Sequence, residues 1–359
     1  MNSPVAPLIT AADVFPPAGR RARFTVLDVR APVEVARGQL PHAVNIPILE
    51  DDERRQVGIA YKGAGQEAAV KLGLELTRMA MAGRVARWRE YCAKGPTAIA
   101  CWRGGLRSQI AQSYLGENPA PRVAGGYKAL RAYLLAEFLS SLEGRQVLTL
   151  TGMTGSGKTD LLESLTAIPR LLALDLEGIA HHRGSAFGHI GEQPAQQSFE
   201  NQLAANVVLH SGDTLLVEDE SRRIGAVHLP EPLFSRISQG PVLLLDAPWQ
   251  ERIQRIHDQY ILKPAYQQGP ERAFLDLKEA VSRLRRRLGG AVVERLYRVL
   301  DEVLAAGNWG DSAALEPFIG PLLQEYYDPL YHRAVERMGR PLLARGTKEE
   351  LTNWIRQLL

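Results

Sequence analysis

One segment of the sequence has the spacing of a phosphate-binding loop: residues 152–159 read GMTGSGKT. It matches G-x-x-x-x-G-K-[ST] at every fixed position and lies between a predicted strand and a predicted helix. In such a loop the backbone N–H groups hold phosphate oxygens, the lysine reaches the outer phosphates, and the last hydroxyl can bind Mg²⁺. We therefore predict a phosphate site, with Thr159 as the Mg²⁺ ligand, formed by Gly152, Gly155, Ser156, Gly157, Lys158 and Thr159.

A second candidate is Cys101, which ends a predicted strand and precedes a turn containing Arg103, Gly104, Gly105 and Arg107. The glycines allow backbone N–H groups to point inward at an anion, and the arginines and the following helix start add positive charge. This setting favours a reactive thiolate and predicts binding of an anionic sulfur or selenium donor. The alternative is a buried structural cysteine. The other cysteine of the chain stands in a helical stretch without such a loop, and we expect it to be structural.

Acidic residues follow the predicted strands behind the phosphate loop. The carboxyl ends of neighbouring parallel strands form the ligand crevice of such folds. We therefore expect Asp175, Arg183, Glu218 and Asp219 to face an acceptor substrate or to assist a metal. Asp246 competes for the metal role, and capping of a following loop is an equal alternative for each acid. The sequence thus supports phosphate binding more strongly than ATP hydrolysis.

Four arginines, Arg283, Arg285, Arg286 and Arg287, lie within five positions of a predicted helix. A solvated helix face is the default explanation. Because arginine matches phosphate geometry, contact with the backbone of a folded RNA is the alternative. Lys and Arg exceed Asp and Glu by seven in residues 1–145, so the N-terminal part is another candidate for a polyanionic partner.

Strands that alternate with helices predict an α/β protein with parallel sheets. We expect one domain over residues 1–143, a phosphate-loop domain over 144–310, and a helical C-terminal region over 311–359. Within these we expect helices over 66–94, with a break near Gly83, and over 195–210.

The composition, with 45% hydrophobic and 23% charged residues in 359, is that of a globular protein and excludes disorder, collagen and, with two cysteines, a disulfide scaffold. No apolar run approaches the ~18 residues of a membrane span, and the first residues do not form a signal peptide. We therefore expect a cytoplasmic protein without membrane contact.

Residues 13–140 resemble the rhodanese family. The resemblance rests on LDVR at 27–30, on Glu34 with GQLPHAVNIP at 38–47, and on the loop 101–107. It implies a rhodanese-like parallel-sheet domain in which Cys101 carries a chalcogen atom. It also implies that Asp28, Arg30 and Glu34 organise the domain, as a buried ion pair or a helix cap.

Nearly the whole chain resembles the bacterial tRNA 2-selenouridine synthases. The motifs are CWRGGLRS at 101–108, HRGSAFG at 182–188 and VEDESRRIG at 217–225, next to a P-loop NTPase-like domain. The resemblance implies an enzyme that converts wobble-position 2-thiouridine of tRNA to 2-selenouridine. Geranyl diphosphate first alkylates the sulfur, and selenium from selenophosphate then replaces the geranylthio group.

The same resemblance places Cys101 in the selenium step, as carrier or nucleophile. It implies that selenophosphate is held by Arg103, Gly104, Gly105 and Arg107. It further implies tRNA as partner, no stable protein partner and no tightly bound cofactor. A standard Walker B strand is not evident, so the need for ATP is doubtful and we expect the phosphate loop to hold the diphosphate. The alternative is a rhodanese-type sulfurtransferase coupled to an ATP-dependent kinase-like domain that acts on a small molecule.

Overall fold

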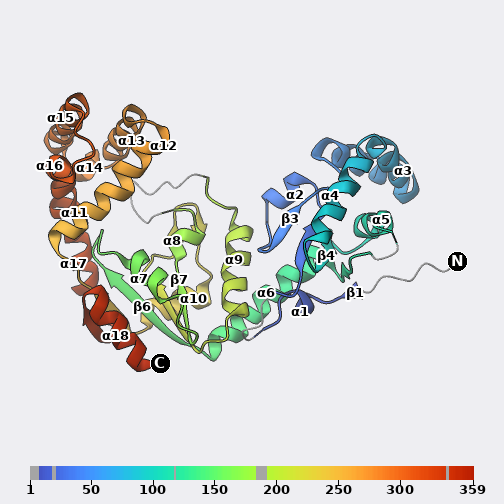
Figure 1. Ribbon diagram of the computed structural model, residues 1–359, viewed down its shortest axis with the longest axis horizontal. Helices are drawn as coiled ribbons and strands as arrows, with labels where there is room; N and C mark the ends of the chain where they lie inside the picture. Colours follow the sequence, from blue (N-terminus) through green and yellow to red (C-terminus); the bar gives the residue numbers. More distant parts are fainter. Residues whose placement is uncertain (1–7, 18–21, 117–118, 183–191, 337–338) are drawn as a thin grey trace. The chain divides into compact units, whose positions relative to one another are not determined.

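The chain forms two compact units in a computed structural model, which describes residues 8–17, 22–116, 119–182, 192–336 and 339–359. Unit 1 comprises residues 1–145 and 194–212, and unit 2 comprises residues 146–193 and 213–359. Figure 1 shows the elements of both units. Each unit has its own parallel sheet, which confirms the predicted α/β class.

Unit 1 is built on a five-stranded parallel sheet in the order β1-β5-β4-β2-β3. All four residues of β4 are buried, as expected for a central strand with helices on both faces. The sheet therefore holds the segment that follows β4, which begins with Cys101, at its carboxyl edge. The strands are β1 (Leu8–Ile9), β2 (Thr25–Asp28), β3 (Ala43–Asn45), β4 (Thr97–Ala100) and β5 (Arg122–Val123).

The helices of unit 1 agree with the prediction in part. The helix predicted from residue 66 begins there, because the non-helical backbone of Gly65 separates it from an unpredicted helical stretch that starts at Asp51. The break lies at residues 78–80, whereas Gly83 lies inside the next helix. A long C-terminal helix of this unit, α6, was not predicted. The helices are α1 (Ala11–Val14), α2 (Pro32–Ala36), α3 (Asp51–Thr77), α4 (Met81–Ala93), α5 (Leu106–Tyr114), α6 (Gly126–Glu143) and α9 (Gln196–Leu209).

Helix α9 belongs to unit 1, although its residues lie inside the range 144–310 expected for the phosphate-loop domain. It packs along α6, and Arg131 of α6 donates a hydrogen bond to Asn201 Oδ1 at 2.8 Å (Figure 1). Arg145 binds the end of α9 by donating to the carbonyl oxygens of Val207 at 2.7 Å and Gly212 at 2.8 Å. These contacts explain why the chain returns to unit 1 after the first part of unit 2.

Unit 2 is built on a second five-stranded parallel sheet in the order β12-β11-β6-β8-β7. β6 is central and pairs with β8 on one side, so the loops that follow these two strands lie at the same edge. A short antiparallel pair, β9 and β10, follows β8. The strands are β6 (Gln146–Gly152), β7 (Leu171–Leu174), β8 (Thr214–Glu218), β9 (Arg223–Ile224), β10 (Val227–His228), β11 (Val242–Leu245) and β12 (Leu342–Gly346).

The C-terminal part of unit 2 is mainly helical and buries its own apolar core, which includes Phe274, Leu296 and Phe318. The expectation of a wholly helical region over 311–359 is corrected by β12, which extends the sheet beside β11. The helical segments, with η marking π-helical turns, are α7 (Lys158–Leu165), α8 (Leu176–Ile179), α10 (Glu231–Gln239), α11 (Trp249–His257), η1 (Asp258–Leu262), α12 (Lys263–Gln268), α13 (Pro270–Arg283), α14 (Arg285–Leu288), α15 (Gly290–Ala306), α16 (Ser312–Leu322), η2 (Leu323–Tyr327), α17 (Asp328–Glu336) and α18 (Lys348–Leu358).

Among the residues that the structure describes, no helix is both long enough and apolar enough to span a membrane.

Candidate active site

The loop after β4 is held by close backbone packing. Gly104 has φ of +68°, and a Cβ atom there would lie 2.6 Å from the carbonyl oxygen of Val123. Gly126, with φ of +57°, approaches so closely that a Cβ would lie 2.1 Å from the carbonyl oxygen of Cys101. Only glycine fits both positions. The sequence analysis identified Gly104 but missed Gly126, whose signal is the Gly-Gly pair just after a short strand.

Cys101 lies at the base of this loop and is 3% exposed. Its Sγ is 3.4 Å from Ser108 Oγ and 3.9 Å from the carbonyl oxygen of Gly105. Ser108 in turn donates a 2.8 Å hydrogen bond to the Gly105 carbonyl oxygen. Cys101 is also one of the residues that line a cavity of about 900 Å³. Cys101 is thus a candidate nucleophile held by its own loop.

The two arginines of the loop differ in their contacts. Arg107 donates to both carboxylate oxygens of Glu34, and these contacts together with the ion pair outweigh burial and lower the pKa of Glu34. Arg107, which we predicted to bind an anion, therefore uses its charge at least in part to position the loop. Arg103 lines the cavity and makes no ion pair within the described part of the chain. Of the two arginines, Arg103 is therefore the better candidate to bind an anion.

A buried ion pair between Asp28 and Arg30 lies next to the cysteine loop, as the resemblance to the rhodanese family implied. Arg30 is fully buried, and its Nη2 lies 2.7 Å from Asp28 Oδ2 and 2.8 Å from the carbonyl oxygen of Gly38. Its guanidinium also lies 3.7 Å from the ring centroid of Tyr127, which stacks on Trp102. These aromatic contacts were not predicted.

Cys92 is half-buried and packs at the edge of the unit 1 core, as expected for a structural cysteine. Burial raises the pKa of its thiol. It is therefore a poor nucleophile at neutral pH.

In unit 2 the phosphate loop has the geometry that its sequence predicted. It connects β6 to α7, with Gly155 and Gly157 at φ of +78° and +90°. Ser156 Oγ is buried and has no hydrogen-bond partner among the described residues. Lys158 Nζ lies 3.3 Å from the carbonyl oxygen of Gly152. A buried hydroxyl without a partner beside a lysine and a helix N-terminus is a setting that a bound phosphate would complete.

The loop borders a cavity of about 220 Å³ that also contains residues the sequence analysis missed. Arg255 of α11 donates to the carbonyl oxygens of Gly155 and Ser156, each at 3.3 Å, and lines the cavity. Glu177 and Glu220 line it as well. Arg255 is far from the phosphate loop in the sequence and belongs to no motif, so only the fold shows that it lies there.

Among the acids, the structure places Glu218 beside the phosphate loop. It ends β8, is fully buried, and its Oε1 lies 3.4 Å from Thr159 Oγ1. Burial, followed by the charges of Glu177 and Asp175, raises its pKa well above the usual range. Glu218 therefore has the position of the second acid that the sequence left open.

The other candidate acids are engaged elsewhere. Asp219 pairs with Arg340 at 2.6 Å, and Asp246 pairs with Arg345 at 2.6 Å. Asp175 caps α8 by accepting a 2.6 Å hydrogen bond from Gly178 N. Within the described ranges, no three His, Cys, Asp or Glu side chains are grouped to bind a metal ion. Arg183 lies outside the described residues.

The arginine cluster is split between two helices rather than lying on one. α13 ends at Arg283 and α14 begins at Arg285, with buried Leu284 between them. All four arginines are exposed. Arg285 pairs with Glu294, and Arg287 donates to the Tyr326 hydroxyl.

Comparisons with known proteins agree on one family. A family model described as "tRNA 2-selenouridine synthase AAA domain" matches residues 145–359. A tRNA 2-selenouridine synthase of Cupriavidus pinatubonensis is 39% identical over 350 residues, covering 92% of this chain and 94% of the relative. Those of Cupriavidus necator and Hahella chejuensis are 40% identical over 348 residues (92% and 94% covered) and 39% over 338 residues (89% and 88% covered).

A solved N-terminal domain from Clostridium difficile 630 is 26% identical and covers 36% of this chain and 98% of that one. Its TM-score of 0.32 is too low to support an argument about fold.

The two parallel sheets, the arginine-flanked cysteine loop and the phosphate loop define an α/β enzyme of the transferase class with a separate candidate site in each unit. The chain belongs to the tRNA 2-selenouridine synthase family. This confirms the resemblance on which the sequence analysis relied.

Proposed function

We propose that this enzyme converts wobble-position 2-thiouridine of tRNA to 2-selenouridine in two steps. Geranyl diphosphate alkylates the sulfur, and selenium from selenophosphate then replaces the geranylthio group. The observation that carries the proposal is that the phosphate loop and the cysteine loop lie in different units, each beside its own cavity. Two separate anion-binding loops suit a reaction with two different phosphorus-containing substrates.

The first step belongs to unit 2. The thiouridine sulfur forms a bond to the first carbon of the geranyl group, the carbon–oxygen bond breaks, and diphosphate leaves with the electron pair. N3 of the base loses its proton to solvent. The developing charge on the diphosphate is stabilised by Lys158, by the N-terminus of α7 and by the Ser156 hydroxyl. Thr159 and Glu218 would hold a Mg²⁺ ion, which would supply further stabilisation of this charge.

An apolar pocket next to the phosphate loop supports a substrate with a hydrocarbon part. This pocket, of about 30 Å³, lies among helical segments of unit 2 and is lined by Leu277, Phe318 and Leu322. It shares Ile256 and Tyr260, among other residues, with the cavity of the phosphate loop. A prenyl diphosphate places apolar carbon beside its phosphates, so apolar side chains here suit its first carbons, whereas a pocket of this volume is too small to enclose a whole geranyl chain.

The second step belongs to unit 1, which we propose is rhodanese-like. Alkylation makes the sulfur a better leaving group and leaves C2 electrophilic. The Cys101 thiolate attacks C2 and expels the geranylthiolate, which takes a proton from solvent. Selenium of selenophosphate then attacks C2 and displaces Cys101, and water cleaves the selenium–phosphorus bond to leave phosphate and the selenocarbonyl. Arg103 and the backbone N–H groups of Gly104 and Gly105 hold the selenophosphate, while Arg107 positions the loop.

The test is mass analysis of nucleosides from 2-thiouridine tRNA incubated with the full chain, geranyl diphosphate and selenophosphate. Lys158→Ala should lower geranylation by roughly a hundredfold, since it removes one charge-stabilising group, yet retain selenation of pre-geranylated tRNA. Cys101→Ser should still form geranylated thiouridine but little selenouridine, and Cys92→Ser should change neither step. The proposal fails if a folded Cys101→Ser protein also loses geranylation, if Lys158→Ala geranylates normally, or if geranylation requires ATP hydrolysis.

A further inference from the structure

The cavity beside Cys101 is much larger than selenium delivery requires. At about 900 Å³ it falls near the upper end of the roughly 300–1,000 Å³ range of pockets that bury whole organic ligands. Selenophosphate is no larger than an ordinary oxyanion and needs only the few groups of the loop itself. Most of the cavity therefore has another purpose.

One side of the cavity combines exposed apolar side chains with the charged side chains of Arg54, Arg55 and Lys62. It comes from α3, a 27-residue helix that buries only Ala69 and Thr77. Ile59 and Leu74 of this helix line the cavity although they are 62% and 45% exposed. Exposed aliphatic side chains that gather around one cavity, rather than being scattered, mark a binding site for an apolar group.

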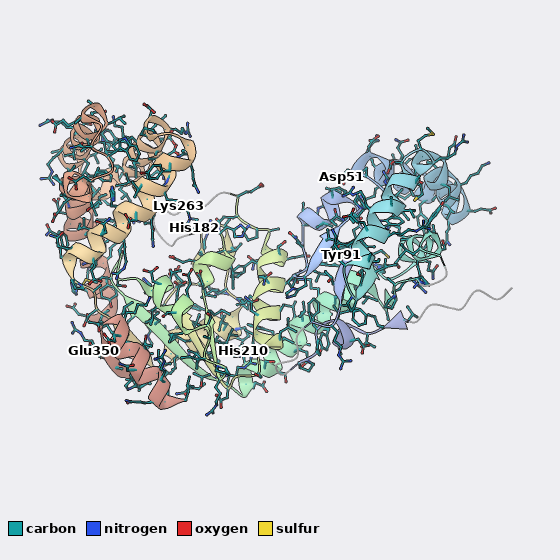
Figure 2. The ribbon with its side chains drawn as sticks, viewed as in Figure 1. Asp51, Tyr91, His182, His210, Lys263 and Glu350 are labelled. Carbon is teal, nitrogen blue, oxygen red and sulfur yellow. The ribbon has the colours of Figure 1, made fainter. Side chains whose placement is uncertain are left out.

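Helix α3 lines the cavity from both sides of a bend. The helix is anchored at its first residue, Asp51, which is labelled in Figure 2. Its Oδ1 accepts a 2.8 Å hydrogen bond from Val33 N. The helix bends at Gly65, whose φ of 82° interrupts the helical backbone. The apolar residues on both sides of this bend, Ile59 before it and Val70 and Leu74 after it, line the same cavity.

The cysteine loop and the start of α5 also line the cavity. They contribute apolar Leu106 and Ile110 together with Cys101 and Arg103. The cavity thus joins a hydrocarbon-sized apolar space to a nucleophile and a cation. A group that combines an apolar chain with a carbon undergoing substitution fits this arrangement.

We propose that this cavity binds the geranylthio group of the alkylated tRNA base and so holds C2 against the Cys101 thiol. The inference rests on the proposed two-step function and deepens it by assigning the leaving group its own site. When Cys101 forms its bond to C2 and the carbon–sulfur bond breaks, the electron pair departs with the geranylthiolate into the apolar space. The enzyme then selects for the alkylated base, because unmodified thiouridine cannot fill the cavity.

Gly73 provides a variant that fills the cavity with little risk to the fold. It lines the cavity on α3, and a Cβ there would meet only Val57 Cγ2 at an ordinary 3.5 Å. Leucine is a better helix former than glycine, so Gly73→Leu should fold. The matched control is Gly63→Leu on the same helix, where a Cβ meets nothing within 4 Å and which does not line the cavity.

The experiment measures selenation of tRNA whose thiouridine sulfur carries a methyl, a five-carbon prenyl or a geranyl group. We expect the natural sequence to prefer geranyl over methyl by at least roughly tenfold, as apolar pockets discriminate chain length by such factors. Gly73→Leu should lose that preference by slowing the geranyl substrate alone, while geranylation of 2-thiouridine tRNA stays normal. Gly63→Leu should behave like the natural sequence.

Selenation that is independent of chain length in the natural sequence overturns the inference and leaves the proposed function standing. A Gly73→Leu protein that slows all three substrates equally also overturns the inference. Protection of Cys101 from iodoacetamide by geranyl diphosphate alone overturns it too, since the cavity would then bind the substrate of the first step. If no S-alkylated tRNA is selenated, the proposed function fails and the inference fails with it.

Discussion

Thr159, the last residue of the phosphate-loop motif, lies with its hydroxyl 3.4 Å from Oε1 of Glu218, the last residue of the neighbouring strand β8. Because β6 and β8 pair in parallel, the end of β8 stands beside the loop that follows β6. A hydroxyl and a carboxylate at this distance are hard oxygen donors that suit Mg²⁺, which usually keeps several waters as well. The relationship makes Glu218 the acid of unit 2 whose removal is most informative.

We predict that Glu218→Gln lowers geranylation by roughly a hundredfold at low Mg²⁺ and shifts the Mg²⁺ dependence to higher concentration. The Glu218 carboxyl, whose pKa is raised by burial, would ionise on binding the cation, and an amide cannot. Selenation of pre-geranylated tRNA should be unchanged. The control is Asp246→Asn, since Asp246 is paired with Arg345 at an exposed position. Rates measured over a Mg²⁺ series decide the matter, and an unaltered Mg²⁺ dependence in Glu218→Gln would contradict the role.

The affinity of the phosphate cavity for diphosphate should depend on pH through Glu220. Burial, and then the charge of Glu177, raises the pKa of Glu220 to about 8. The group is therefore neutral at pH 6.5 and becomes anionic above pH 8, where it repels a bound anion. Since its folded pKa lies above the unfolded value of 4.5, its contribution to stability is complete below pH 4.5 and is lost as pH rises through 8.

Calorimetric titration with inorganic pyrophosphate, with and without Glu220→Gln, tests this. The ratio of the two affinities cancels the titration of the ligand itself. It should be near one at pH 6.5 and should reach roughly tenfold in favour of Glu220→Gln at pH 9, the size expected for one charge at partly screened range. A ratio that stays constant across this range would show that Glu220 does not titrate there.

The sequence predicted the parts of each site that depend on neighbours along the chain. The phosphate loop and the cysteine loop are each one strand, one turn and one helix, so their residue types and spacing specify them locally. The choice among Glu218, Asp219 and Asp246 depended instead on strand order and on Arg340 and Arg345. Those arginines come from the C-terminal segment, and their pairing with the acids has no local signal.

Groups brought in by packing were missed for the same reason. Arg255 reaches the phosphate loop from α11, and Tyr127 stacks on Trp102 from α6. α6 itself was not predicted, although Leu130, Leu134, Phe138 and Leu142 recur at helical spacing; its start at glycine offers no side-chain capping signal. Helix α9 shows the limit most clearly: its pattern predicted a helix, but only its contacts with α6 assign it to unit 1.

Unit 1 should depend strongly on its buried ion pair. Asp28→Asn leaves the fully buried guanidinium of Arg30 without its anionic partner, which costs about 3–5 kcal/mol of unfolding free energy for pairs of this kind. Both cysteines of the chain lie in unit 1, so thiol labelling in a urea series reports the unfolding of this unit alone. Asp52→Asn, which removes only an exposed pair with Arg55, should leave the midpoint unchanged. Equal midpoints for the two variants would contradict the structural role of the buried pair.

The arginine cluster of α13 and α14 should contribute to tRNA binding through the phosphate backbone. Arg286 is the cleanest single test, because the structure gives it an exposed side chain and no ion pair within the described ranges. Arg286→Ala should weaken tRNA binding and make the salt dependence shallower by about one unit of slope, and replacing Arg283, Arg285 and Arg287 as well should extend the loss. Arg272→Ala, at the other end of α13 and paired with Asp276, is the matched control.

Filter binding over a salt series gives the slopes. If the slope with all four arginines replaced equals that of the natural sequence, the cluster is a solvated face, and the basic excess of residues 1–145 becomes the surface to test next.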